Sequence, residues 1–518
     1  MNLNSENLKP ESLEWAKLHI DRFGDTDLLP FPFEYKAIGA SWPKVKGKLL
    51  STDLATWETG ALRHFLVPKP TGGFRVTTQL DPLDALLYTA IVYEIAEEIE
   101  RSRPKQDLRV ACSYRVELKP DGQLFRRETG WTDFDAKSKE LVFSADCHYV
   151  VNADISDFYN QISHHRVENA LESAGISQNL SRTVERLLGC WTAGQSRGIP
   201  VGPHASIILA EACLTDVDKF LLSNGFNFTR YVDDFRIFCA SLKEAQKALH
   251  ELSAYLYRSH RLALQGGKTR IQTVERFIED LEDPAKLEET AKSTRLAALL
   301  EEASADSLYS STETVMEDEV ELDVAREALV ELFNFSLAQE PLRLGLTRYV
   351  LKRAAYLRIA ALQEPILDNL ERLGPVLPEI VRYLTKIPTK HLHPNAANRM
   401  LWLISSSPVD FMPFVREWVA YFFSQIDETT CTTKAFALFD RDPESGARRC
   451  ALLVRKLQDT SWPRNRKEIW RNYGPWDRRA VILSASALPS DERKHWLKNP
   501  AKSDDLLDYC QAIAAASF

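Results

Sequence analysis

The pattern of apolar and polar residues predicts a mixed first half of the chain. Residues 61–80 and 226–240 each read as two runs of β-branched and aromatic residues around a turn, which predicts two hairpins. Residues 149–155 form a short apolar run that is typical of a buried strand. Apolar residues recur at helical spacing in 82–100 and 163–190, so we expect helices there.

The remaining segments have weaker or different patterns. Residues 1–60 predict an N-terminal extension that is helical in part, and residues 107–145 predict irregular strands and loops. Residues 279–325 are acidic and rich in Ser and Thr, which favours a linker or a loose helical segment. From 326 to 518 helical patterns follow one another between prolines, and stacked helical pairs are one arrangement that this predicts.

The length of 518 residues supports roughly three domains. We expect an N-terminal extension (1–60), a strand-and-helix domain (61–280), an acidic connecting segment (281–325) and an α-helical domain (326–518).

Composition narrows the cellular setting. No stretch is apolar over the roughly 20 residues of a membrane helix, and residues 1–10 lack the apolar run of a secretory signal. The eight cysteines are scattered without a Cys-x-x-Cys pair, which argues against structural zinc and against a disulfide scaffold. We expect a cytoplasmic protein with reduced thiols and no membrane partner. The net charge of -8 means that any nucleic acid would bind to a local basic patch.

Candidate chemistry lies in the second hairpin. Asp233 and Asp234 stand side by side at its turn, and Asp154 lies near the end of the predicted strand 149–155. If that strand lies beside the hairpin, three carboxylates converge and offer Mg²⁺ the hard oxygen ligands that it prefers. Such a site suits two-metal phosphoryl transfer. By itself the Asp-Asp pair is more simply a solvated turn, and the order of further motifs decides the matter.

Five motifs in this order resemble the reverse-transcriptase family over residues 61–280. They are the hairpin Arg63 to Arg75, Asp154-Ile-Ser-Asp-Phe-Tyr159, Gly198-Ile-Pro-Val-Gly-Pro-His-Ala-Ser206, Tyr231-Val-Asp-Asp234 and Leu262-Ala-Leu-Gln-Gly-Gly-Lys-Thr-Arg-Ile271. The resemblance implies an α+β right-hand polymerase fold, with fingers and an antiparallel palm sheet with helices, followed by the all-α C-terminal domain.

The resemblance also implies roles for individual residues. The ligands of two Mg²⁺ ions, or of Mn²⁺, would be the carboxylates Asp154, Asp233 and Asp234 and the backbone carbonyl of Ile155. Lys268 would neutralise or protonate the leaving pyrophosphate. The incoming dNTP would meet Lys69, Arg75, Tyr159, Gly202 and Ser206. The ring of Tyr159 would exclude a 2′-hydroxyl, whereas one of Phe158 and Tyr159 is expected to be a core aromatic.

Within this family the chain is most similar to bacterial abortive-infection and other defence-associated reverse transcriptases. The phrase Gln79-Leu-Asp-Pro-Leu-Asp84, running into residues 87–90, and the long helical C-terminal region carry that similarity. The paired-cysteine nuclease segment of many mobile-intron enzymes and the Val-Thr-Gly element of retron enzymes are not found. The resemblance implies a HEAT-like helical repeat and a homo-oligomer.

The implied activity is Mg²⁺-dependent polymerisation of dNTPs in antiphage defence, in some members without a template and primed by the protein's own hydroxyl groups. Single-stranded nucleic acid is then a partner, as a non-coding RNA or as a DNA product that can be covalently attached. Three alternatives stay open: a conventional RNA-templated enzyme with a partner non-coding RNA, a degenerate polymerase fold that serves as an RNA-binding scaffold, and a protein-interaction module in which the helical half does the work.

Other candidate residues have plainer explanations. We expect the tyrosines of the C-terminal half to be packing residues, with Tyr509 the most mobile candidate for priming. The Arg- and Trp-rich stretch 462–479 suits single-stranded nucleic acid, but we favour two helices packed through Trp470 and Trp476. For His164-His165 we see no cysteine or carboxylate partner at ligand spacing, so we expect an ordinary start of a helix.

Overall fold

The computed structural model describes residues 7–126, 130–144, 146–282, 319–443 and 445–517. The chain forms two compact units, and each is built from three separate stretches of sequence. The first unit comprises 1–23, 52–59 and 83–311, and the second comprises 24–51, 60–82 and 312–518.

The first unit is centred on a four-stranded antiparallel sheet in the order β4-β5-β3-β6. The strands are β3 (Tyr149–Asp154), β4 (Asn227–Tyr231), β5 (Asp234–Cys239) and β6 (Arg270–Thr273). β3 lies in the interior of the sheet between β5 and β6, and its residues Val150, Val151 and Ala153 are buried.

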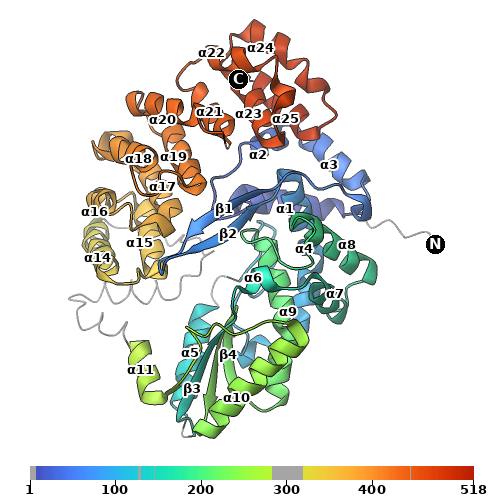
Figure 1. Cartoon of the computed structure of the whole chain (residues 1–518), viewed down its shortest axis with the longest axis vertical. Coiled ribbons are helices and arrows are strands. Elements are labelled where there is room, and N and C mark those ends of the chain that lie inside the picture. Colours follow the sequence, from blue (N-terminus) through green and yellow to red (C-terminus); the bar gives the residue numbers. More distant parts are fainter. Residues whose placement is uncertain (1–6, 127–129, 145, 283–318, 444, 518) are drawn as a thin grey trace. The chain divides into compact units, whose positions relative to one another are not determined.

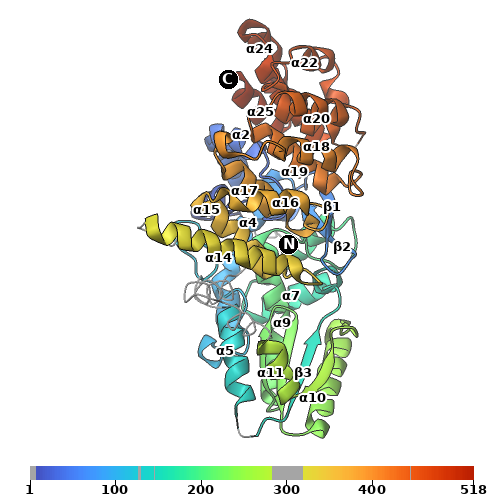
Figure 2. The ribbon, with the colours of Figure 1, turned by 90° about the vertical axis from the view of Figure 1, so that its left-hand side faces the viewer.

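Helices cover both faces of this sheet (Figures 1 and 2). On one face, Val142 of α5 (Trp131–Val142) and Phe277 of α11 (Val274–Glu282) pack with Val150 and Phe238 of the strands. On the other face α10 (Leu242–Tyr255) packs against β3 and β5, and α9 (His204–Ser223) packs against α10. A reciprocal cap starts α10, because Glu244 N–H donates to Ser241 Oγ and Ala240 N–H donates to the Glu244 carboxylate.

Helices make up most of the rest of the first unit, both before the sheet in the sequence and between its strands. They are α1 (Pro10–Phe23), α4 (Pro82–Ser102), α5 (Trp131–Val142), α6 (Phe158–Gln161), α7 (His164–Ser173), α8 (Gln178–Trp191), α9 (His204–Ser223), α10 (Leu242–Tyr255) and α11 (Val274–Glu282).

The second unit joins a two-stranded hairpin to the C-terminal helices. β1 (Arg63–Pro68) pairs with β2 (Phe74–Gln79) in antiparallel register, so that Val67 lies opposite Arg75. α2 (Glu34–Ala40) packs against the last helix, α25 (Leu506–Ala516), and α3 (Trp42–Ser51) follows α2.

The C-terminal helices stack one upon the next, as Figure 1 shows from yellow to red. Alternate helices are neighbours: α15 packs on α17, α17 on α19, α19 on α21, α21 on α23 and α23 on α25. The helices are α14 (Glu319–Ala338), α15 (Leu344–Leu357), α16 (Gln363–Asp368), α17 (Leu377–Lys386), α18 (Ala396–Ser405), α19 (Pro413–Gln425), α20 (Thr430–Asp440), α21 (Gly446–Val454), α22 (Ser461–Arg466), α23 (Pro475–Ser484) and α24 (Ser490–Leu497). This succession fits the predicted stacking of helical pairs.

The predicted fold class is confirmed, with one correction to an element. Residues 107–145 were expected to be irregular, but α5 occupies 131–142 and buries Phe134, Ser138 and Val142 on one face. The hairpin residues 60–82 group with the C-terminal helices, although the predicted domain 61–280 joined them to the later strands. The acidic segment 281–325 falls largely outside the described residues.

Candidate active site

The candidate site lies where β3 meets the β4–β5 hairpin. Asp154, the last residue of β3, pairs directly with Asp234, the first residue of β5. Tyr231 also pairs with Asp234, so Val232 and Asp233 form a two-residue turn. Ile155 N–H donates to the carbonyl oxygen of Asp233 over 3.2 Å, which ties the end of β3 to this turn. The register thus gathers the three predicted carboxylates.

The fifth sequence motif runs beside the same strand end. Gln265 N–H donates to the Asp154 carbonyl over 2.7 Å, and Ser156 N–H donates to the Ala263 carbonyl over 2.9 Å. Lys268 N–H in turn donates to the Gln265 carbonyl over 3.0 Å. These bonds place the Lys268 ammonium 2.8 Å from the Asp154 carboxylate, where the two groups form an ion pair.

Like charges surround Asp234. Desolvation, then the charges of Asp233 and Asp154 and a hydrogen bond to Asp154, raise its pKa to about 7, although the residue keeps exposed surface. The pKa of Asp234 is raised even though the residue has access to water, because the two neighbouring carboxylates oppose its ionisation. Burial acts to lower the pKa of Lys268, but the hydrogen bond to Asp154 and the three negative charges outweigh it and raise it.

The donor set fits a hard divalent cation. Carboxylate oxygens are the ligands that Mg²⁺ and Mn²⁺ accept, and gathered carboxylates need a positive partner. Lys268 supplies that partner to Asp154 here. Among the described residues, the group of three whose ligand atoms lie within 4.8 Å of one another is a different one, His165, Glu168 and Glu185. The three aspartates therefore need side-chain adjustment to share an ion.

Phe158 and Tyr159 divide as expected into a core and a partly exposed aromatic residue. Phe158 is 2% exposed, whereas Tyr159 is half-buried. Ile199 N–H donates to the Tyr159 carbonyl over 2.9 Å, and Gly198 N–H donates to the Ile162 carbonyl over 2.7 Å. The glycine-containing motif 198–206 is therefore bonded to the segment that carries Tyr159.

Gly202 and Ser206 have different environments within that motif. Gly202 has φ +130°, a backbone conformation that favours glycine. Ser206 is 1% exposed and its hydroxyl lies 3.1 Å from the Tyr88 hydroxyl in the core. The expectation that Ser206 contacts a nucleotide is corrected accordingly, because its hydroxyl is turned into the packing between helices α4 and α9.

Lys69 and Arg75 are both exposed on the β1–β2 hairpin. Lys69 N–H donates to the Gly73 carbonyl over 3.0 Å, and Gly72 and Gly73 have φ of +83° and +77°. The two glycines thus allow the tight turn that presents Lys69. Both cationic side chains belong to the second unit, and the three carboxylates belong to the first.

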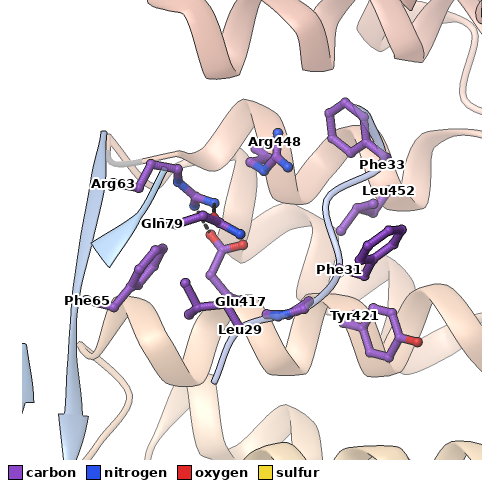
Figure 3. A pocket seen from close by; sticks show the side chains of 11 residues that line it. Leu29, Phe31, Phe33, Arg63, Phe65, Gln79, Glu417, Tyr421, Arg448 and Leu452 are labelled. Carbon is purple, nitrogen blue, oxygen red and sulfur yellow. Dashed lines mark hydrogen bonds and ion pairs between the residues drawn. The ribbon is translucent and has the colours of Figure 1, made fainter. Parts of the chain in front are cut away.

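A small cavity in the second unit, of about 30 Å³, adjoins the start of this hairpin (Figure 3). Arg63 and Glu417 form an ion pair of 2.6 Å at its wall, and Arg448 binds Glu34 through both ends of its guanidinium group. The volume has room for one or two water molecules. We interpret the ion pairs around this cavity as contacts that attach β1 to the helices, and we do not interpret the cavity as a nucleotide site.

The remaining sequence candidates are mostly structural. Trp462, Trp470 and Trp476 are buried, as the packing interpretation of 462–479 predicted, although Trp470 lies in a short 3-10 turn and not in an α-helix. The neighbouring arginines form ion pairs, for example Arg464 with Glu492. His165 does have carboxylate neighbours, because Glu168 lies one helical turn on and Glu185 comes from α8. The prediction that it lacked them was wrong.

The candidate priming tyrosines are mixed. Tyr349 and Tyr383 are fully buried packing residues, whereas Tyr356 is 44% exposed. The ring of Tyr509 carries the Lys44 ammonium at 3.4 Å from its centre. Tyr309 lies outside the described residues.

An antiparallel sheet with two aspartates at a hairpin turn, a third on the adjoining strand and a lysine beside them defines a polymerase palm of the nucleotidyl-transferring class. Residues 67–299 match the family described as reverse transcriptase (RNA-dependent DNA polymerase), so the chain carries a reverse-transcriptase domain. The resemblance to reverse transcriptases that the motifs indicate is thus confirmed for this domain.

One curated relative is the Retron Ec86 reverse transcriptase of Escherichia coli, which is 23% identical over 180 residues. The match covers 33% of this chain and 56% of the relative, so the chain spans little more than half the length of the relative it matches.

Solved structures of telomerases are also similar. The telomerase of Candida albicans in complex with a TWJ fragment of telomeric RNA has 12% identity and a TM-score of 0.33, over 79% of this chain and 71% of that one. Apo telomerase of Candida tropicalis has 10% identity and a TM-score of 0.33, over 80% and 74%.

Among the described residues, no helix has both the length and the apolar character needed to cross a bilayer.

Sequence reasoning missed Ser113 and Arg230, which hydrogen-bond to the backbone of Val232 in the turn that carries Asp233 and Asp234. An arginine in the otherwise uncharged run from Phe226 to Tyr231 was the available signal for Arg230.

Proposed function

We propose that the chain is a reverse-transcriptase DNA polymerase that joins dNTPs at the Asp154, Asp233 and Asp234 site and acts in antiphage defence. The pairing of Asp154 with Asp234, with Lys268 2.8 Å from Asp154, carries the proposal. The family match over residues 67–299 supports the reaction class.

The side chains divide the work of one nucleotide addition. The carboxylates would hold two divalent ions, which when bound supply charge neutralisation to the 3′-hydroxyl and the triphosphate. Lys268 would hold a proton near the leaving pyrophosphate, and its raised pKa keeps it a cation. The exposed Lys69 and Arg75 would bind the triphosphate, and Tyr159 would lie against the sugar.

Metal-dependent incorporation of labelled dNTPs by the purified chain tests this proposal. We expect Asp233→Asn to lower incorporation at least about 100-fold. Loss of a residue that only orients a metal ligand costs up to about 100-fold, and Asp233 is proposed as a ligand itself. Asp21→Asn, an exposed change on α1, is the matched control and should keep wild-type activity. Substantial incorporation by Asp233→Asn, with an unchanged circular dichroism spectrum, would contradict the site assignment.

The same assay with and without an added primer–template separates two forms of the function. Template-free synthesis that leaves label on the protein would support a self-primed abortive-infection enzyme, the form that the sequence resemblance favours. Synthesis only on an added RNA template would support a conventional reverse transcriptase, the form that the similarity to the retron enzyme favours.

A further inference from the structure

The turn that presents Asp233 and Asp234 begins with a residue in an unfavourable conformation. Val232 has φ +55°, in the left-handed region. A β-branched side chain is rarely found there, because its branched carbon crowds the backbone. Something in the surroundings must therefore hold Val232 in place.

Two buried side chains grip both polar backbone groups of Val232. Its N–H donates to the Ser113 hydroxyl over 2.9 Å, and its carbonyl oxygen accepts from Arg230 Nη1 over 2.7 Å. Ser113 and Arg230 are both 0% exposed. The peptide groups on either side of the strained residue are thus fixed by groups that themselves have little freedom to move.

Helix α9 supplies the carboxylates behind this grip. Arg230 donates to both oxygens of Asp218, over 2.7 and 2.6 Å, and to Glu211 over 3.1 Å. The Ser113 hydroxyl donates to the other oxygen of Glu211. Arg103 donates to Glu211 over 2.8 Å and to the Ser113 carbonyl over 2.8 Å. The hydrogen-bonding groups around Val232 thus form one connected, buried network.

We propose that Ser113 and Arg230 are positioning residues of the polymerase: they hold Val232 in its left-handed conformation and thereby aim the carboxylates of Asp233 and Asp234. This inference rests on the proposed function for its catalytic meaning. The Asp233 carbonyl also accepts from Ile155 N–H, so a shift of Val232 is passed to the end of β3, where Asp154 lies.

Metal binding by the protein alone tests the positioning role of Ser113 and Arg230 without requiring catalysis. In Ser113→Ala we expect the Mn²⁺ concentration at half-saturation, followed by electron paramagnetic resonance, to rise about tenfold, as for other groups that orient metal ligands. Ser181→Ala is the matched control, because Ser181 is also 0% exposed and its hydroxyl has no partner among the described residues. Equal Mn²⁺ binding by the two variants would overturn the proposal.

A double substitution distinguishes positioning from a general loss of stability. Glycine adopts the left-handed conformation without strain, so Ser113→Ala should cost less when combined with Val232→Gly. We expect the tenfold loss of Mn²⁺ affinity to shrink to about threefold or less in that background. An undiminished loss would show that Ser113 does not act through Val232.

Parallel dNTP incorporation separates this inference from the proposed function. Suppose that Ser113→Ala binds Mn²⁺ more weakly than the wild type, and that the wild type incorporates no dNTP. That result would support the positioning role of Ser113 and overturn the proposed polymerase function. Wild-type incorporation that Ser113→Ala leaves unchanged across a Mg²⁺ series would do the reverse. Should Ser113→Ala not fold, Arg230→Lys replaces it: lysine keeps the charge but lacks the fork that reaches Asp218 and Val232 together, and the same loss of Mn²⁺ affinity is expected.

Discussion

At the scale of single residues, Tyr159 has the surroundings of a group that can meet a substrate. Its ring lies 5.6 Å from that of Phe158, measured between centroids, and the two are nearly perpendicular. Phe158 fills the core and Tyr159 keeps partial exposure. The backbone of Tyr159 is fixed by the bond from Ile199 N–H, so the ring has a defined place beside the glycine-containing motif.

We predict that Tyr159→Ala relaxes discrimination against ribonucleotides. Loss of the ring opens space for a 2′-hydroxyl, and the preference for dNTP over rNTP in kcat/KM should fall by about 10- to 100-fold, the range that one steric contact provides. Tyr159→Phe keeps the ring and should keep the preference. If the preference is unchanged in Tyr159→Ala, the ring does not exclude the 2′-hydroxyl.

The sequence revealed residues whose meaning is local. Asp233 and Asp234 are adjacent, and Asp154 closes an apolar run, so three residues of the candidate site could be predicted from short motifs. Ser206 lay within such a motif, yet its orientation into the core follows from the contact with Tyr88, 118 residues away. Ser113 is likewise 119 residues from Val232. A pattern along the chain carries no record of such long-range contacts.

At the scale of elements, a buried pair of histidines joins α1 to α9. His19 Nδ1 lies 2.7 Å from the Gly122 carbonyl, so it must carry the proton that is donated there. In neutral His19 the other ring nitrogen, Nε2, is then an acceptor for His204 Nδ1–H, 2.8 Å away. Protonation of His19 at Nε2 would set two N–H groups against each other.

Acid should therefore loosen the docking of these helices. Burial, followed by the neighbouring His204, lowers the pKa of His19 to about 3, and burial lowers the pKa of His204 to about 4. Both values lie below that of an unfolded histidine, so the unfolded chain binds more protons below about pH 6.5. The free energy of unfolding should fall by up to about 2 kcal/mol per histidine between pH 7.5 and pH 5.

Urea unfolding at a series of pH values checks this prediction. His204→Asn keeps a side-chain donor towards His19 and removes one titrating ring, so its loss of stability at pH 5 should be smaller than that of the wild type. The exposed His250→Asn is the control and should follow the wild-type curve. Parallel curves for His204→Asn and the wild type would contradict the assigned pKa values.

Elements with a strong period could be predicted, and weakly patterned ones could not. β3, β4 and β5 lie within the ranges predicted for them, because each combines β-branched or aromatic residues with a clear boundary. α5 was missed because its buried face includes Ser138 beside Phe134 and Val142, so its apolar stripe is narrow. Packing against the strands of the sheet makes that stripe a buried helix face.

At the scale of the whole molecule, the ion pair of Arg63 and Glu417 joins two distant parts of the chain. Arg63 opens β1, and Glu417 lies in α19, where it also accepts from Arg449 over 3.1 Å. Burial acts to raise the pKa of Glu417, but the charges of Arg63, Arg449 and Arg448 outweigh it and lower it. The carboxylate is therefore ionised and shared by two buried arginines.

Replacement of this carboxylate should destabilise the second unit. Glu417→Gln removes the ionised partner of Arg63 and one of the two carboxylates that Arg449 contacts, the other being Asp442. Breaking a buried ion pair in this way typically costs about 3–5 kcal/mol. Hydrogen exchange of the β1 amides should accelerate along with the fall in unfolding free energy. Asp427→Asn is the control, because Asp427 is 89% exposed and lies 3.6 Å from Lys456. The free energy of unfolding of Asp427→Asn should fall by less than about 1 kcal/mol. An equally small fall for Glu417→Gln would show that the ion pair does not stabilise the packing of β1 on the helices.

Because the two units alternate along the chain, the parts of the second unit leave the ribosome at widely separated times. β1 and β2 emerge from the ribosome about 230 residues before the C-terminal helices of their own unit begin, an interval on the order of 10–50 s at typical rates of translation. A lone hairpin is marginally stable in water, and its Phe65 and Val67 find their buried places only in the completed unit. The first unit can close while the second is still being made, so the nascent hairpin depends on chain that does not yet exist.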